Sequence, residues 1–140
     1  MKAIRLHARG GPEQMVYEDA PLPAPAAGEA LLRVHAAGIT PTELTWSESY
    51  RTPEGHERLP TIPGHDVSGV VEALGMSVTG VSPGDAVYGL IEFSRDGSAA
   101  EHVVVRAADL APKPGTLDHV CAAAGRAFKQ SRPRHSQMKP

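Results

Sequence analysis

One short stretch, residues 61–75, constrains the fold of this chain more than any other. It reads TIPGHDVSGVVEALG. Pro63 fixes φ and lacks an amide donor, while Gly64 can adopt backbone angles that are closed to other residues, so the pair predicts a sharp turn. The apolar run Val67–Leu74 is rich in β-branched residues and predicts a buried strand. The stretch therefore predicts a turn that displays polar side chains where a core strand begins.

The two polar residues at this turn are His65 and Asp66. A lone histidine where a strand begins is more typical of a hydrogen-bonded structural residue than of a metal ligand. Asp66 is first interpreted as an acceptor of backbone amide bonds at the turn, and second as part of a substrate cleft. Gly69, inside the strand, predicts a bulge or another backbone passing close by.

Composition limits the class of protein. A chain of 140 residues, 41% hydrophobic and 21% charged, is typical of one globular domain. A net charge of −2 gives no electrostatic footprint for nucleic acid or an anionic membrane surface. The single cysteine, Cys121, excludes an internal disulfide. No apolar run approaches the roughly 20 residues of a membrane span, and residues 1–10 lack a signal-peptide core, so we expect a cytoplasmic protein.

Short apolar or alternating segments, separated by turns, predict a mainly β fold with short helices. The chain contains 13 prolines and 14 glycines, which favours many turns over a helical bundle. The segments expected as strands are Lys2–His7, Met15–Glu18, Glu29–Ile39, Val67–Leu74, Ala86–Leu90 and Ala99–Arg106. The segments Pro21–Gly28 and Ala108–Pro114 are expected to be irregular.

A short helix is predicted to begin at Thr40. Thr40 is a candidate N-cap, Pro41 suits the first helical position, and Glu43 stands three residues after the cap, as in a capping box. Capping thus explains Thr40, Thr42 and Glu43, and a catalytic role for them is the less favoured hypothesis. The polar residues 47–59 that follow predict a flexible excursion.

The end of the chain changes character. Residues 116–124 predict a capped helix that Gly125 breaks. Cys121 within it is expected to be inert and buried, or else exposed because a partner domain is missing. Residues 126–140 carry five basic side chains, Arg126, Lys129, Arg132, Arg134 and Lys139, and no acidic one. We expect residues 125–140 to be a disordered basic tail rather than a nucleic-acid arm.

A series of motifs falls in a familiar order along the chain. They are MKAI (1–4), PAP (23–25), GEAL (28–31), VHAAGI (34–39), PGHDVSGVV (63–71), GVSPGDAVYG (80–89) and AEH (100–102). Together they resemble the amino-terminal catalytic domain of the medium-chain dehydrogenase/reductase superfamily, which includes alcohol dehydrogenases and quinone oxidoreductases. The resemblance implies a GroES-like (chaperonin-10-like), partly open β-barrel over residues 1–124.

The resemblance also implies a reaction, hydride transfer, and leads us to expect that one domain is missing from this chain. In such proteins hydride passes between NADPH and a carbonyl, alkene or quinone bound between two domains, and the cofactor carries the chemistry. Here no G-x-G-x-x-G follows a predicted strand, so we expect the nucleotide-binding Rossmann domain to be absent. The chain is then a truncated oxidoreductase, which binds no cofactor and is inactive alone.

The resemblance predicts no metal site. Zinc-dependent relatives have a cysteine where this chain has Thr40, a histidine at His65 and a third ligand near Gly125. Only the histidine is present here, and a catalytic zinc site uses three protein ligands. The pattern is similar to the zinc-independent, quinone-oxidoreductase-like branch.

Two aromatic residues complete the candidate site. By resemblance, Trp46 and Tyr50 lie beside the substrate cleft, although Trp46 could simply pack the short helix. The substrate-cleft candidates are therefore Thr40, Thr42, Glu43, Trp46, Tyr50, His65 and Asp66. None of them is assigned a catalytic role.

A second hypothesis is a non-enzymatic GroES-like module. Missing carboxy-terminal elements would expose an edge of the barrel, through which the chain could pair with another protein or form a homodimer. A zinc-binding protein is the third and least favoured hypothesis.

Overall fold

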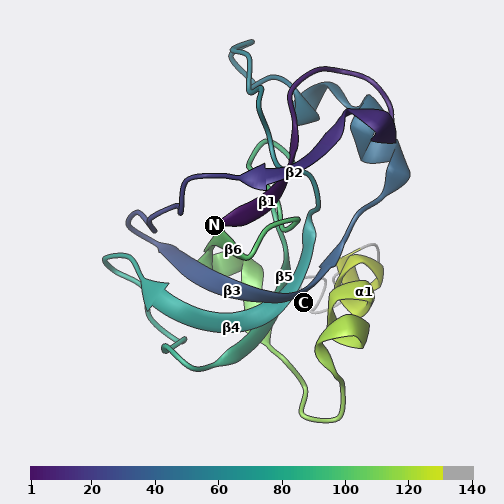
Figure 1. The fold of residues 1–140 in the computed structure, drawn as a ribbon. Coiled ribbons are helices and arrows are strands. Elements are labelled where there is room, and N and C mark those ends of the chain that lie inside the picture. The colour runs from purple at the N-terminus through teal and green to yellow at the C-terminus, as the bar shows by residue number, and fades with distance from the viewer. Residues whose placement is uncertain (131–140) are drawn as a thin grey trace, which may run out of the picture.

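A curved, five-stranded antiparallel sheet forms the centre of the structure, in the spatial order β6-β3-β4-β5-β7 (Figure 1). Its strands, in chain order, are β3 (Glu29–Gly38), β4 (Asp66–Leu74), β5 (Ala86–Leu90), β6 (His102–Arg106) and β7 (Leu110–Pro112). The computed structural model describes residues 1–130. Within them the edge strands β6 and β7 do not pair, so the expected mainly β, partly open architecture is confirmed.

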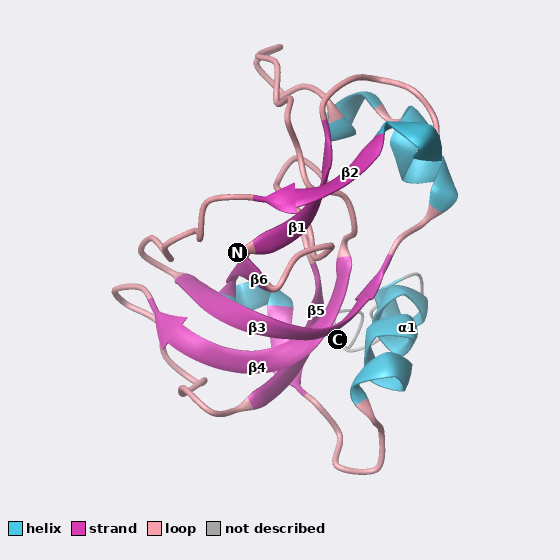
Figure 2. Ribbon diagram, viewed as in Figure 1, coloured by secondary structure: helices cyan, strands magenta, loops and turns pink. Residues whose placement is uncertain are grey.

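A two-stranded hairpin lies against this sheet (Figure 2). It consists of β1 (Lys2–Leu6) and β2 (Met15–Asp19), paired antiparallel around the short 3-10 helix η1 (Pro12–Gln14), as the sequence predicted. Single bridges from Ala3 to Ala100 and from Leu6 to Thr61 connect β1 to the rest of the fold.

The hydrophobic core lies on the inner face of the sheet. Its fully buried members are Ala30, Leu32, Val67, Val71, Val87, Ile91, Val103 and Val105. Within β4, an added Cβ on Gly69 would lie 2.2 Å from the carbonyl oxygen of Arg33, and the register of β3 against β4 shifts between Val34 and Ala36. The close backbone approach predicted as one alternative at Gly69 is confirmed, and the bulge lies opposite it in β3.

The last helix, α1 (His119–Gln130), differs from its prediction at both ends. It starts after Asp118, whose Oδ1 accepts a hydrogen bond from the Cys121 amide at 2.8 Å, so this residue caps the helix. The helix continues through Gly125, since an interior glycine costs only about 1 kcal/mol. Cys121 is exposed, so the first expectation, burial, was wrong and the alternative of exposure holds. Residues 131–140 of the predicted tail lie outside the described residues.

Two further segments are more ordered than expected. Residues 110–112, predicted as irregular, form β7, because they pair with Val87–Gly89 of β5. Pro112 is tolerated there, since an edge strand can lack a donor on its outer side. The polar excursion holds the 3-10 helix η3 (Ser47–Ser49) and a bridge between Arg51 and Glu57. Among the described residues, no helix is long and apolar enough to cross a bilayer.

Candidate functional site

A small cleft of about 180 Å³ lies where the 3-10 helix η2 (Pro41–Thr45), the start of β4 and the end of β5 meet. It is lined by Thr40, Glu43, Trp46, His65, Asp66, Leu90 and Phe93. Five of the seven sequence candidates thus share one cavity. Leu90 and Phe93 had no signal in the sequence that tied them to the site.

The turn before β4 directs side chains into this cleft. Gly64 has φ +92°, and an added Cβ there would lie 2.8 Å from Ser98 Oγ. The loop that contains Ser98 closes on the turn: Ser98 N–H donates to the Gly64 carbonyl at 2.7 Å, and Ser98 Oγ donates to the Asp66 carbonyl at 2.8 Å. The sharp turn predicted at Pro63 and Gly64 is confirmed, and it fixes the position of His65.

Glu43 does not serve mainly as a helix cap. Thr40 makes no side-chain capping bond, so the expected capping box was wrong on that side. The Glu43 side chain is only 3% exposed, and its Oε1 accepts a hydrogen bond from the Gly64 amide at 3.1 Å. Its Oε2 lies 3.2 Å from Nε2 of His65, which is 6% exposed. η2 therefore delivers a carboxyl group to the turn that carries the histidine.

Burial moves the pKa values of these two groups in opposite senses. Burial raises the pKa of the Glu43 carboxyl to about 7, helped by the Asp66 charge and opposed by the amides of Gly64 and Thr40. Burial, together with the Arg58 charge, lowers the pKa of His65 to about 4. At neutral pH the imidazole is uncharged, and the carboxyl is close to half protonated. The Glu43 carboxyl can therefore hold a proton beside the neutral imidazole near neutral pH.

Two polar atoms in the cleft have no partner among the described residues. Nδ1 of His65 is buried without a hydrogen bond, and so is Oδ1 of Asp66. Burial raises the pKa of Asp66. The expectation that Asp66 accepts backbone amides at the turn is not met at Oδ1, which is a buried acceptor without a partner in the described residues.

Aromatic rings form the apolar wall. The ring centroids of Trp46 and Phe93 lie 5.0 Å apart, and the two rings are tilted by 58° to each other. Phe93 also contacts His65 edge to face, with 5.2 Å between the ring centroids. Tyr50 lies elsewhere: it is buried, and its hydroxyl donates to the Leu44 carbonyl at 2.5 Å. Thr42 is exposed on η2 and does not line the cleft.

The site does not offer the ligands of a zinc centre. No group of three His, Cys, Asp or Glu side chains is arranged to hold a metal within the described residues. Thr40 brings a hydroxyl to the cleft, where a thiolate would be needed. A cavity of about 180 Å³ is also too small to enclose a dinucleotide, since pockets for drug-sized ligands span roughly 300–1,000 Å³.

Comparison with known proteins agrees with this geometry. The Alcohol dehydrogenase GroES-like domain family matches residues 26–115. Quinone oxidoreductase of Rattus norvegicus is 37% identical over 119 residues, which cover 84% of this chain. This chain spans only 35% of the length of that relative.

Solved structures give the same result. The quinone oxidoreductase from Coxiella burnetii superposes with a TM-score of 0.79 at 29% identity, over 89% of this chain and 40% of that protein. The mycobacterial protein Rv1454c complexed with NADPH superposes with a TM-score of 0.72 at 31% identity, over 89% of this chain and 36% of that protein. The described fold thus corresponds to one part of each of these larger proteins.

Proposed function

Because this chain belongs to the Alcohol dehydrogenase GroES-like domain family, we propose that it is the substrate-binding half of a zinc-independent, NADPH-dependent oxidoreductase of the quinone oxidoreductase type. The observation that supports this most is the composition of the cleft. The buried Glu43–His65 pair lies beside the aromatic wall of Trp46 and Phe93. A planar ring that bears carbonyl groups, such as a quinone, could pack against the aromatic wall and place an oxygen beside the Glu43–His65 pair.

The cleft residues have distinct roles in this proposal. Trp46 and Phe93 contact the ring of the substrate and exclude water from it. The Thr40 hydroxyl can donate a hydrogen bond to an oxygen of the substrate, and the Asp66 carboxyl can do so when it is protonated. Reduction of a carbonyl also requires a proton, and the Glu43 carboxyl, with a pKa of about 7, can hold one beside the cleft at neutral pH. NADPH, when bound in a full-length enzyme, supplies the hydride.

The chain alone should not turn over substrate in this account. Its cleft is one wall of a substrate site and gives no cradle for a pyrophosphate. We therefore expect no NADPH oxidation by the purified chain with tetramethyl-1,4-benzoquinone, a quinone with no ring position open to attack by the exposed Cys121.

A chimera tests whether the cleft is functional. Residues 1–124 of this chain would replace the matching part of the rat quinone oxidoreductase. The proposal predicts NADPH-dependent quinone reduction by the chimera and none by the remaining part of the rat enzyme alone. A chimera that folds and binds NADPH, but reduces no quinone, would refute the proposal.

A further inference from the structure

Arg58 is a cation whose side chain is almost completely buried. It stands near the end of the polar excursion, and only 9% of its side chain is exposed. The carboxylate with which it pairs, that of Asp96, lies 3.8 Å away and is 61% exposed, so this ion pair alone does not explain the burial. A guanidinium removed from water needs hydrogen-bond acceptors for its N–H groups. Its other contacts supply them.

Three oxygen atoms from separate segments accept hydrogen bonds from Arg58. Nη1 donates to the main-chain carbonyl of Glu48 in η3 and to that of Phe93, the latter at 3.4 Å. Nη2 donates to Thr61 Oγ1 at 3.1 Å. The backbone of Arg58 is itself held, because its amide donates to the Tyr50 carbonyl at 2.8 Å. The guanidinium thus joins the excursion, the segment before the β4 turn and the loop after β5.

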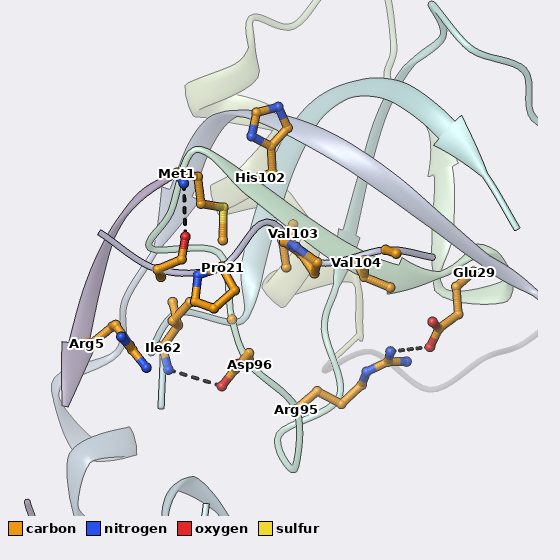
Figure 3. A pocket seen from close by; sticks show the side chains of 14 residues that line it. Met1, Arg5, Pro21, Glu29, Ile62, Arg95, Asp96, His102, Val103 and Val104 are labelled. Atoms are coloured by element: carbon orange, nitrogen blue, oxygen red, sulfur yellow. Dashed lines mark hydrogen bonds and ion pairs between the residues drawn. The ribbon is translucent and has the colours of Figure 1, made fainter. Parts of the chain in front are cut away.

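The loop after β5 is fixed at its far end by other groups. Asp96 Oδ1 accepts a hydrogen bond from the Ile62 amide at 3.2 Å, beside a separate pocket of about 440 Å³ (Figure 3). Gly97 N–H donates to the Ile62 carbonyl at 2.7 Å. At the near end of the loop, the Arg58 guanidinium is the only group in the described part of the chain that hydrogen-bonds to the main chain of Phe93.

The position of Phe93 determines one wall of the cleft. Its ring contacts those of Trp46 and His65, with 5.0 Å and 5.2 Å between the ring centroids. Phe93 is nevertheless 40% exposed, so neighbouring side chains cover only part of it. The main chain that carries the ring must therefore be held in place for the wall to keep its shape.

We propose that Arg58 is a positioning residue of the cleft: its guanidinium holds the main chain of Phe93 and thereby sets where the ring meets the substrate. The part that concerns substrate binding rests on the proposed function, whereas the placement of Phe93 does not. Arg58 uses one nitrogen for the two carbonyls and the other for the Thr61 hydroxyl. The single nitrogen of a lysine cannot make the same set of contacts.

The charge of Arg58 also acts on His65. Burial and, after it, the Arg58 charge lower the pKa of His65 to about 4, while the Asp96 charge opposes them. The carboxyl that contacts the ring is that of Glu43, at 3.2 Å. Loss of the Arg58 charge would move the pKa of His65 up toward its ordinary 6.5. At pH 7.5 the imidazole therefore stays essentially uncharged, and its NMR signals report on geometry rather than on protonation.

The test compares variants of the 140-residue chain at pH 7.5. Arg58→Met removes the guanidinium, and Arg58→Lys keeps the charge but offers one nitrogen. Arg51→Met is the matched control, because Arg51 lies in the same excursion, donates to the Gly55 carbonyl at 3.2 Å and does not line the cleft. Phe93→Ala gives the His65 signals without the neighbouring ring. Thermal unfolding would verify each fold, and Arg58→Lys decides the comparison should Arg58→Met unfold.

Two measurements follow the wall. We expect the His65 ring-proton signals to move in Arg58→Met toward their positions in Phe93→Ala, to move less in Arg58→Lys, and to stay in place in Arg51→Met. Saturable quenching of Trp46 fluorescence by tetramethyl-1,4-benzoquinone gives the affinity of the cleft. That affinity should fall at least about twofold in Arg58→Met, by no more than in Phe93→Ala, and by less in Arg58→Lys.

Wild-type His65 signals in both Arg58 variants would overturn the proposal, and so would equal changes in Arg51→Met. An Arg58→Lys protein with wild-type signals and affinity would also overturn it, because charge alone would then suffice. Absence of saturable quenching in the wild-type chain would contradict the proposed function instead, and the His65 signals would still decide the role of Arg58.

Discussion

Oε2 of Glu43 lies 3.2 Å from Nε2 of His65, and both side chains are almost completely removed from water. The two residues come from different elements, η2 and the turn before β4, and the Gly64 amide binds the same carboxyl at 3.1 Å. A buried carboxyl with a pKa near 7 and a neutral imidazole make this the most electrostatically unusual place among the described residues. Perturbed pairs of this kind concentrate at functional sites.

Replacement of Glu43 by Gln should change how stability depends on pH. The folded-state pKa of Glu43 is raised from 4.5 to about 7, so its contribution to stability is complete below pH 4.5 and is lost as pH rises through 7. Each pKa unit is worth 1.36 kcal/mol, so the loss amounts to roughly 3 kcal/mol. The free energy of unfolding of Glu43→Gln, relative to that of wild type, should increase by about that much between pH 4.5 and pH 8, as measured by urea unfolding.

The neighbouring histidine does not confuse this comparison. The pKa of His65 is lowered to about 4, so its contribution is present above pH 6.5 and is lost as pH falls toward 4. That trend lies below pH 6.5, so the change between pH 6.5 and pH 8 reports on Glu43 rather than on His65. A difference between variant and wild type that stays constant with pH would show that Glu43 ionises normally.

Gly64→Ala should destabilise the fold more than the same change at a control glycine. Gly64 and Gly80 both have positive φ, +92° and +84°, so alanine is strained at each by about 1–2 kcal/mol. At Gly80 an added Cβ meets nothing within 4 Å, whereas at Gly64 it lies 2.8 Å from Ser98 Oγ. We expect an additional loss of about 1–2 kcal/mol for Gly64→Ala in urea unfolding. Equal losses would contradict a close-packed turn.

The attachment of α1 should weaken in acid. His119, at its first turn, lies with Nδ1 2.6 Å from the buried Ser68 Oγ, and its ring stacks on His35 at 4.4 Å. Burial lowers the pKa of His119, aided by the charges of His35 and Lys113 and opposed by Asp118. The stability that it contributes is therefore present above pH 6.5 and lost as pH falls. Amide exchange in α1 should accelerate in acid relative to β4.

Two variants separate the parts of this contact. His119→Gln should cost about 1 kcal/mol at pH 7.5, the net value of a hydrogen bond, and should reduce the pH dependence of exchange in α1. His35→Gln keeps the bond to Ser68 and should retain most of the stability at pH 7.5. An unchanged pH profile in His119→Gln would show that another group controls the helix.

Phe93→Ala should weaken quinone binding in the cleft about two- to twelvefold, because a ring contact contributes about 0.5–1.5 kcal/mol. Tyr17→Ala is the control, since Tyr17 is an exposed ring on β2 that does not line the cleft. Isothermal titration with tetramethyl-1,4-benzoquinone would compare the two. Equal affinities would show that the quinone binds outside the aromatic wall.

Local signals predicted most of the strands and the sharp turn, because a proline–glycine pair and β-branched alternation act over a few residues. The hairpin of β1 and β2 and the close approach at Gly69 followed from such signals. The three residues of β7 were missed, since their pairing partner on β5 supplies the structure that their own sequence does not. The motifs resembling a known family added the fold, which composition alone left as mainly β.

The chemistry of the site could be predicted only in part. Glu43 looked sufficiently explained by capping, because its contact with Gly64 and His65 depends on how η2 packs against a distant turn. Phe93 lies in a polar loop with no periodic signal, so its place beside Trp46 was visible only in three dimensions. Thr42 and Tyr50 lie close in sequence to the site, but their side chains do not line the cleft.

The fluorescence of Trp46, the only tryptophan in the chain, tests the central claim most directly. It lines the cleft, so a bound quinone should quench it. Titration with tetramethyl-1,4-benzoquinone should give saturable quenching, whereas N-acetyltryptophanamide should show only linear, collisional quenching, and NADPH should give no saturable change. Linear quenching of the protein by quinone, or saturable binding of NADPH to this chain alone, would contradict a substrate wall that depends on a separate cofactor domain.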